Sequence, residues 1–271
     1  ENICKAKMEV VEGMNEHGEL VLCADEPLLL AYRYGKHNPT YVSVYNSEAE
    51  FRAVNVKYAD NSTSFDLLFN RQVVTNLQIP ALGLHHVYSA LFAYAIGVKF
   101  GLESETIRHG FMKFKNAAMR QSIYDIGGVK IIDACYNASP ESMRASIEVL
   151  CELSRQMGGA RKMALLGDMR ELGSETRVLH EKLGEFVADK KLDKLFTYGL
   201  AASSVASSAK KCGMAEGDIY DNPDITDPLA SGKAILEVIK PGDIILFKAS
   251  RAMAAEKIIT FLRENESKIR G

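Results

Sequence analysis

Residues 131–143 read IIDACYNASPESM, and residues 165–173 read LLGDMRELG. Each stretch starts with apolar residues typical of a buried strand and passes into polar residues that open a helix. Open α/β sheets bind their ligands where strands end in this way. The two stretches therefore predict an α/β sheet with a ligand site at the carboxyl ends of its strands.

The same alternation of strand and helix patterns continues around these stretches. Strands are predicted at residues 122–126, 129–133, 162–166, 194–198 and 243–247. Helices are predicted at residues 140–156, 176–190, 201–211, 228–239 and 253–264. Such alternation is typical of a parallel, doubly wound sheet with helices on both faces.

The first part of the chain has a different pattern. A helical pattern at the start leads to GELVLCADEPLLL, which predicts an apolar strand from Gly18, an acidic turn and a short helix. Residues 41–79 alternate in a way typical of strands added at a sheet edge, and helices are predicted at 84–100 and 104–114. A boundary at 115–119 divides the chain into domains of residues 1–117 and 118–271.

Composition excludes several classes of protein. The chain has 271 residues, 47% of them hydrophobic, which is enough for two domains with cores. Its net charge is −2 without a basic block, which argues against nucleic-acid binding. No apolar run reaches the roughly 18 residues needed to span a bilayer, so no membrane insertion is expected. The five cysteines are scattered without C-x-x-C spacing, which favours a reducing, cytoplasmic location.

Five motifs occur in an order and spacing that resemble those of the Mur ligases. They are LGLHHVYSALFAYAIGVKFGL (82–102), MRQ (119–121), DACYNASPESMRA (133–145), LLGDMRELG (165–173) and FKASRAM (247–253). With the opening ENICKAKMEVVEG, the resemblance covers essentially the whole chain. It implies a fold in which the second part of a P-loop-type ATPase domain, a mixed sheet with helices, precedes a Rossmann-like, doubly wound domain that binds an amino acid or dipeptide.

The resemblance also implies an ATP-dependent amide ligase of peptidoglycan precursor synthesis. ATP, with Mg²⁺, phosphorylates the carboxylate of a UDP-N-acetylmuramoyl-peptide, and an amine attacks the acyl phosphate. YNASP together with GDMRELG is most similar to the members that add D-alanyl-D-alanine. The alternatives are a related ligase that adds a different amino acid, and a noncatalytic binding module from a truncated or decayed relative.

A phosphate-binding loop is missing from this chain. No G-x-x-x-x-G-K-[ST] occurs, and no G-x-G-x-x-G replaces it. Phosphoryl transfer depends on such a loop, and Glu1 falls directly in a helical pattern. We therefore expect an upstream segment of the same protein to carry the loop and the UDP-binding domain, and this chain alone to be inactive.

In the first domain the resemblance implies three site residues. Lys7 corresponds to a lysine that becomes carbamylated and helps to hold Mg²⁺; a solvated surface lysine is the alternative, and Lys5 is a nearby competitor. His85 and His86 correspond to a His-Asn pair that contacts the nucleotide base. The chain departs from the family pattern at His86 and at three further positions, which are Cys23, Ser89 and Ala134.

At the start of the second domain the resemblance implies a nucleotide and substrate site. Arg120 corresponds to an arginine at the interdomain joint that reaches ATP phosphate; a solvated linker arginine is the alternative. The strongest local signal is Tyr136-Asn137-Ala138-Ser139-Pro140. Ser139 can cap a helix whose first turn holds Pro140, which leaves N–H groups and the Asn137 amide aimed at a ligand. Tyr136 and Ser139 are expected on the substrate side, Asn137 in catalysis and nucleotide binding. The family carries an acid at position 134, where this chain has Ala134; either Asp133 substitutes for it in catalysis, or activity is reduced.

Two later loops complete the expected site. Asp168 and Glu171 are substrate-side or loop-organising candidates, and His180 is expected to be a packed or surface histidine. Lys248 and Arg251 flank Ser250 where a strand meets a helix start, a combination that favours an anion. The terminal carboxylate of the dipeptide is the expected anion, and ordinary capping by Ser250 is the alternative.

Overall fold

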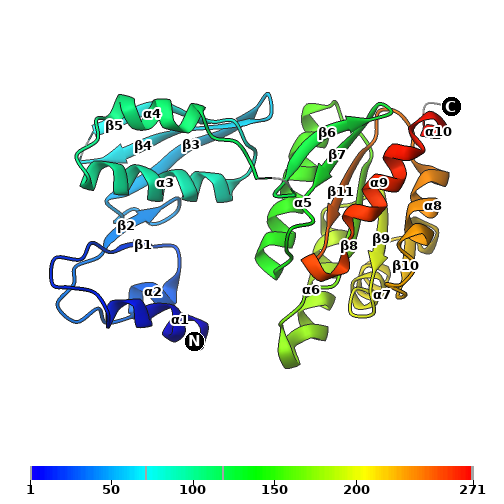
Figure 1. Ribbon diagram of the computed structural model, residues 1–271, viewed down its shortest axis with the longest axis horizontal. Helices are drawn as coiled ribbons and strands as arrows, with labels where there is room; N and C mark the ends of the chain where they lie inside the picture. Colours follow the sequence, from blue (N-terminus) through cyan, green and yellow to red (C-terminus); the bar gives the residue numbers. More distant parts are fainter. Residues whose placement is uncertain (1, 71, 118, 270–271) are drawn as a thin grey trace. The chain divides into compact units, whose positions relative to one another are not determined.

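The structure is a computed structural model that describes residues 2–70, 72–117 and 119–269. The chain divides into two compact units, Glu1–Lys115 (unit 1) and Asn116–Gly271 (unit 2). Each unit has its own sheet and its own core (Figure 1).

Unit 1 contains a five-stranded mixed sheet in the order β1-β2-β3-β4-β5. Its strands are β1 (Val21–Cys23), β2 (Thr40–Ser43), β3 (Phe51–Ala59), β4 (Ser62–Phe69) and β5 (Gln72–Ile79). The first three run parallel, and the last three form an antiparallel meander. Alternate residues of β3 are buried near its start, as expected for a strand with one face on a core.

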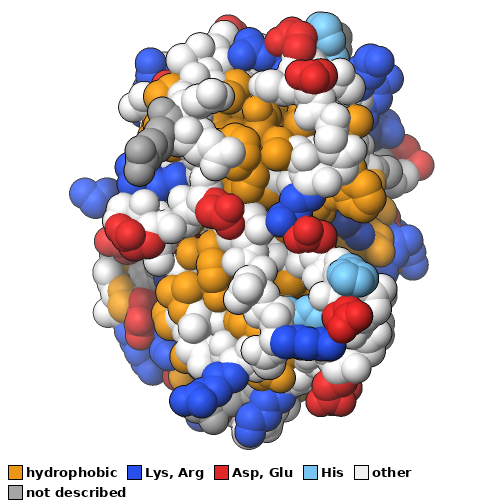
Figure 2. Space-filling view, turned by 90° about the vertical axis from the view of Figure 1, so that its left-hand side faces the viewer, with side chains coloured by type: hydrophobic (Ala, Val, Ile, Leu, Met, Phe, Trp, Pro, Cys, Tyr) orange, Lys and Arg blue, Asp and Glu red, His pale blue; other side chains and the backbone are white. Residues whose placement is uncertain are grey.

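The helices of unit 1 join its sheet in two separate apolar clusters. They are α1 (Asn2–Met8), η1 (Glu9–Val11), α2 (Pro27–Ala31), α3 (Leu84–Lys99) and α4 (Ser104–Met112). Helix α3 packs on β1 to β5, and α4 packs on β5. Val87, Leu91 and Tyr94 of α3 meet Phe51, Phe65, Leu67 and Leu77 of the sheet in one apolar cluster. Figure 2 shows apolar side chains gathered between charged ones on the face of unit 1 that it displays.

Unit 2 contains a six-stranded sheet in the order β10-β9-β8-β11-β7-β6. Its strands are β6 (Ser122–Ile126), β7 (Val129–Asp133), β8 (Lys162–Gly167), β9 (Lys194–Tyr198), β10 (Ile219–Asn222) and β11 (Ile244–Lys248). All neighbours pair in parallel except β6 and β7. Strands β8 and β11 are almost fully buried, as expected for central strands covered on both faces.

Helices cover both faces of this sheet (Figure 1). They are α5 (Pro140–Gln156), α6 (Thr176–Asp189), α7 (Ser203–Lys211), α8 (Pro228–Val238), α9 (Glu256–Glu264) and α10 (Glu266–Ile269), with the short 3₁₀ turns η2 (Gly173–Glu175), η3 (Glu216–Asp218) and η4 (Arg251–Met253). Helix α5 packs on β8 and β11, and α8 packs on α9. Isoleucines of α8 and α9 join the apolar core beneath the sheet.

The predicted fold class is confirmed, with two differences in detail. Strand β10 was not expected, because IYDN is short and half polar. The helix predicted at 253–264 starts only at Glu256, since η4 ends at Ala254 in a left-handed conformation with φ of 49°. In the described part of the chain, no helix has both the length and the apolar character that crossing a membrane requires.

Candidate functional site

The carboxyl ends of the parallel strands of unit 2 meet at one edge of the sheet. Asp133 ends β7, Asp168 follows β8, and Lys248 ends β11, the strand between them. Predicted site residues from three separate motifs are thus brought to the same edge. This is the edge at which open α/β sheets bind ligands.

The loop between β7 and α5 is held by helix capping. The Ser139 hydroxyl accepts from the Ser142 N–H at 3.2 Å, and the Ser142 hydroxyl accepts from the Ser139 N–H at 2.9 Å. Pro140 occupies the first helical position, where its missing N–H costs nothing. Such a reciprocal cap stabilises a helix by about 1 kcal/mol. Ser139 therefore has a structural role whether or not it also meets a ligand.

Tyr136 and Asn137 are exposed on this loop. The Arg120 guanidinium lies 4.1 Å from the centre of the Tyr136 ring, a cation–π contact. The Asn137 side-chain oxygen accepts from the Ala138 N–H at 2.8 Å, which turns the amide along the loop. Arg120 is also exposed, so it keeps donors available for an anion.

Lys248 was predicted to bind an anion, but its side chain is buried. The side chain is only 5% exposed, and its Nζ donates to the Asn137 backbone carbonyl at 3.0 Å. Burial lowers the pKa of the Lys248 amine to about 8. The amine thus binds the loop that carries the Asn137 side chain.

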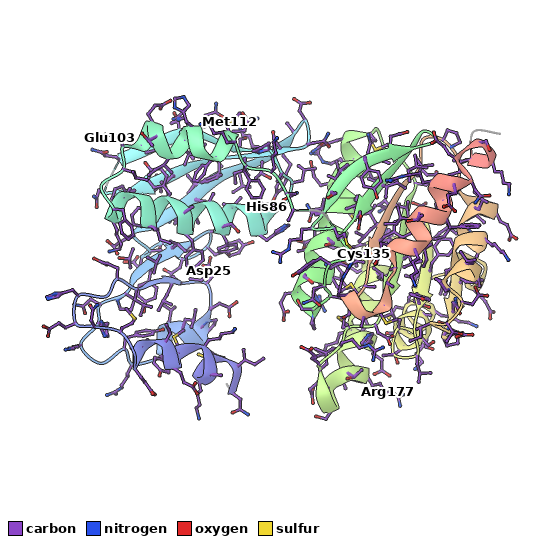
Figure 3. The ribbon with its side chains drawn as sticks, in the orientation of Figure 1. Asp25, His86, Glu103, Met112, Cys135 and Arg177 are labelled. Carbon is purple, nitrogen blue, oxygen red and sulfur yellow. The ribbon has the colours of Figure 1, made fainter. Side chains whose placement is uncertain are left out.

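Asp133 is buried where β7 ends. One carboxylate oxygen accepts from the Cys135 N–H at 3.2 Å, and the other lies 3.5 Å from the Tyr124 hydroxyl. Burial and the nearby Asp133 charge raise the pKa of the Cys135 thiol well above its usual value. Cys135, labelled in Figure 3, is therefore an inert part of the core under this loop. Ala134, the departure from the family pattern, is buried.

The loop after β8 is fixed by side chains that sequence analysis placed near the substrate. An Asp168 carboxylate oxygen accepts from the Ala202 N–H at 2.8 Å. The Ser250 hydroxyl accepts from the Arg170 N–H at 3.0 Å, and the Ser250 N–H donates to the Asp168 carbonyl at 3.2 Å. Ser250 stands at the start of η4 but makes no capping bond there with its side chain. The hydroxyl joins two loops instead.

His180 also holds the loop after β8. It is fully buried on α6, and its Nε2 accepts from the Met169 N–H at 3.0 Å. Nδ1 must then carry the proton, which it donates to the Thr176 carbonyl at 2.6 Å. The neutral imidazole thus anchors the GDMRELG loop to its helix, in agreement with the expected packed histidine.

Glu171 and Arg251 remain exposed at the edge. Glu171 holds a left-handed conformation with φ of 65°, which is unfavourable for a side chain with a Cβ. Arg251 approaches Glu256 with 3.3 Å between Nη1 and Oε1, and its side chain is 59% exposed. Both side chains are open to solvent.

In unit 1, the two predicted histidines start α3 and differ in environment. His85 is exposed, whereas His86 is 9% exposed and its ring meets the edge of Phe114 at 5.4 Å between centroids. Burial lowers the pKa of His86 to about 4, so the ring is neutral at pH 7. Its Nε2 is buried and has no hydrogen-bond partner among the described residues.

Comparisons with known proteins bear on both units. A model of the Mur ligase middle domain matches residues 1–97, and a model of the Mur ligase glutamate ligase domain matches residues 119–251. The chain belongs to the Mur ligase family.

Individual relatives in this family agree. The UDP-N-acetylmuramoyl-tripeptide–D-alanyl-D-alanine ligase of Bacillus subtilis strain 168 is 33% identical over 270 residues, which are 98% of this chain and 55% of that protein. The ligase of the same name from Escherichia coli K12 is 28% identical and matches 97% of this chain and 56% of its own. The chain therefore spans about half the length of the relatives it matches.

Solved structures of Mur ligases share the fold. The structure of MurF ligase from Thermotoga maritima in complex with ADP matches 98% of this chain and 58% of its own, with a TM-score of 0.81 and 22% identity. A MurF structure from Acinetobacter baumannii matches 97% of this chain and 55% of its own, with a TM-score of 0.82 and 24% identity.

The residues expected to bind the nucleotide base fit their ligand better than the residue expected to bind Mg²⁺. The unpartnered Nε2 of His86 suits a nucleotide base, which offers both donors and acceptors. Lys7 lies exposed on α1. Among the described residues, no group of three or more His, Cys, Asp or Glu is placed to hold a metal ion.

Sequence analysis did not single out Asp25, which follows β1. Its carboxylate accepts bonds from both the β2 end and α3. The available signal was an acidic residue directly after a buried parallel strand. Arg170 was also missed as a side chain at the edge, although it lies within the GDMRELG motif.

Proposed function

We propose that this chain is the C-terminal half of a ligase that joins D-alanyl-D-alanine to UDP-N-acetylmuramoyl-tripeptide at the expense of ATP. The observation that carries the proposal is the alignment of 98% of the chain, at 33% identity, with a Bacillus subtilis protein of that name. The site at the carboxyl edge of unit 2 supports it, because its exposed groups suit a zwitterionic dipeptide.

The reaction has two steps. The γ-phosphoryl group of ATP passes to the peptide carboxylate and gives an acyl phosphate and ADP. The amine of the dipeptide then attacks the acyl carbon, phosphate leaves with the C–O electron pair, and the amine nitrogen loses a proton. Both steps depend mainly on positioning and on the stabilisation of negative charge.

The exposed cations and amide of unit 2 take defined roles in this scheme. Arg251 would bind the terminal carboxylate of the dipeptide, since a guanidinium suits a carboxylate. Arg120, held over Tyr136, would neutralise phosphate charge. The Asn137 amide would orient the reacting groups, and Lys248 would keep it in place through the Asn137 carbonyl.

Unit 1 would contribute the nucleotide base site through His85 and His86. The phosphate-binding loop would come from an upstream segment of the same protein, because this chain carries none. We therefore expect the isolated 271-residue chain to form no amide. Lys7 would contribute to Mg²⁺ binding if it is carbamylated in the complete protein.

The test uses the full-length protein encoded by the gene. It is incubated with UDP-N-acetylmuramoyl-tripeptide, D-alanyl-D-alanine and ATP, and the amide product is measured by mass spectrometry. Product that depends on all three substrates supports the proposal. ATP binding without an amide from any acceptor would instead make this protein a noncatalytic relative.

A variant pair separates chemistry from folding. Asn137→Ala should reduce ligation at least a hundredfold while changing stability by about 1 kcal/mol or less, because the side chain is exposed and makes one local bond. The matched control is Asn265→Ala, which removes two local side-chain bonds in unit 2. It should leave ligation unchanged. If the loss of ligation in Asn137→Ala is fully explained by a loss of stability, Asn137 has a structural role.

A further inference from the structure

Asp25 lies between β1 and α3 in unit 1, where its carboxylate collects several hydrogen bonds (Figure 3). The Ser43 hydroxyl donates to Oδ1 at 2.6 Å, and the Tyr88 hydroxyl donates to Oδ2 at 2.7 Å. Backbone N–H groups of residues 44–46 also point at it, with the shortest distances 2.8 and 3.0 Å. Asp25 thus joins the end of β2 to the first turns of α3.

The carboxylate is charged at neutral pH. Burial alone would raise the pKa of Asp25, but the bonds from Ser43, Val44 and Tyr88 outweigh it and lower the pKa. Burial and the bond to this carboxylate raise the pKa of the Tyr88 hydroxyl, which therefore stays a donor. Hydrogen bonds to a charged acceptor are about twice as strong as neutral ones.

Tyr88 links this carboxylate to the predicted base site. It stands three residues after His85 on α3, so the two side chains lie on neighbouring positions of one helix face. Ser43 and residues 44–46 lie at the carboxyl end of β2, and Tyr45 there is 71% exposed. A single charged group therefore fixes both the helix start and the neighbouring loop.

We propose that Asp25 is a positioning residue for nucleotide binding. Through Tyr88 it fixes the first turns of α3, and with them the direction in which His85 and His86 meet the purine. Through the N–H groups of residues 44–46 it fixes the loop beside them. The inference rests on the proposed function, because it takes the two histidines as contacts of the nucleotide base.

An amide cannot replace this carboxylate. Oδ1 accepts from Ser43 and from the Asn46 N–H, while Oδ2 accepts from Tyr88 and from the Val44 N–H. In Asp25→Asn one oxygen becomes an NH₂ group, which cannot accept, so the bond from either the Val44 N–H or the Asn46 N–H is lost whichever way the amide turns, and the remaining bonds lose their charged acceptor. Tyr88→Phe is milder, since it removes only the bond to α3.

Asp66 on β4 supplies a matched control. Its carboxylate also accepts two bonds, from the Asn55 side chain and from the Asn76 N–H, both at 2.8 Å. It lies in the antiparallel part of the sheet, away from the end of β1 in the strand order. Asp66→Asn tests what the loss of a bridging carboxylate does to unit 1 in general.

The experiment measures ADP affinity by calorimetry, KM for ATP, kcat and Tm in the full-length protein. Asp25→Asn and Tyr88→Phe should weaken ADP binding and raise KM for ATP, each about tenfold. A tenfold change corresponds to about 1.4 kcal/mol of binding free energy, which is lost when the histidines no longer point at the base. KM for D-alanyl-D-alanine should stay unchanged. Asp66→Asn should lower Tm and leave ADP affinity as in the wild type.

The outcomes distinguish a failure of this inference from a failure of the proposed ligase function. If both Asp25→Asn and Tyr88→Phe lower Tm but bind ADP like the wild type, Asp25 is structural and the inference is wrong. If Asp25→Asn does not fold, Tyr88→Phe decides, because it keeps the carboxylate and the loop bonds. A wild-type protein that binds no adenine nucleotide overturns the proposed function as well.

Discussion

Replacing Lys248 by Met should leave stability nearly unchanged at neutral pH and lower it at alkaline pH. The side chain is 5% exposed, and burial lowers the pKa of its amine from 10.5 to about 8. That difference corresponds to about 3 kcal/mol against the charged amine in the folded state. The bond from Nζ to the Asn137 carbonyl offsets part of this, by about 1.5 to 3 kcal/mol.

These opposing effects nearly cancel at pH 7. Lys248→Met removes the cost of a buried charge but leaves the Asn137 carbonyl without its donor. The free energy of unfolding should therefore change by only about 1 kcal/mol. The ligation rate should nevertheless fall, because the loop that presents the Asn137 amide loses its anchor.

Above pH 8 the balance changes in favour of the lysine. Between about pH 8 and 10.5 the folded protein holds a neutral amine, while the unfolded chain still binds the proton. Because the unfolded state binds more protons, stability rises with pH, by about 1.4 kcal/mol per pH unit. Lys248→Met lacks this gain and should fall behind the wild type by about 3 kcal/mol by pH 10.5.

Urea unfolding at pH 7, 8, 9 and 10, followed by circular dichroism, tests this reasoning. The difference between wild type and Lys248→Met removes the contributions of other groups that titrate at alkaline pH. Lys233→Met is the control, since Lys233 is exposed on α8, and its difference from the wild type should be constant. A constant difference for Lys248→Met as well would refute the description of a buried amine.

Two further perturbations follow from the two units. Gly199→Ala should destabilise unit 2 by about 2 kcal/mol or more, because φ is 117° and a Cβ would overlap the Asp168 carboxylate. Gly213→Ala is the control, since φ is 98° there but the space around it is open. In the same thermal melt it should cost only about 1 kcal/mol. For His86, burial lowers the pKa from 6.5 to about 4, so unit 1 should lose up to about 3 kcal/mol between pH 6.5 and 4, where only the unfolded ring binds a proton. A His86→Leu variant with the same acid dependence as the wild type would contradict this.

The sequence was sufficient where the deciding interactions are local. The start of α5 could be predicted because Ser139, Pro140 and Ser142 fall within one turn, and their capping chemistry depends only on spacing. The strand and helix alternation of unit 2 likewise repeats within short windows. Strand β10 could not be predicted, because it has only four residues, half of them polar, and these show no clear alternation.

The sequence was not sufficient where a side chain finds its partner far along the chain. Lys248 donates to a carbonyl 111 residues away, and the Ser250 hydroxyl accepts from an amide 80 residues away. Tyr88 reaches Asp25 across 63 residues. Motif spacing could indicate that such residues gather at a sheet edge, but which backbone group each one binds is set by strand order.

The carboxyl edge of unit 2 consequently separates two kinds of polar group. Asp168, His180 and Lys248 are buried and bind backbone N–H or carbonyl groups of the surrounding loops. Asn137 and Arg251 are exposed and rest on loops that these buried groups fix. A site fixed before its ligand arrives loses less entropy on binding. Substitutions of Asp168 and His180 should therefore change stability and rate together, whereas substitutions of the exposed groups should change mainly the rate.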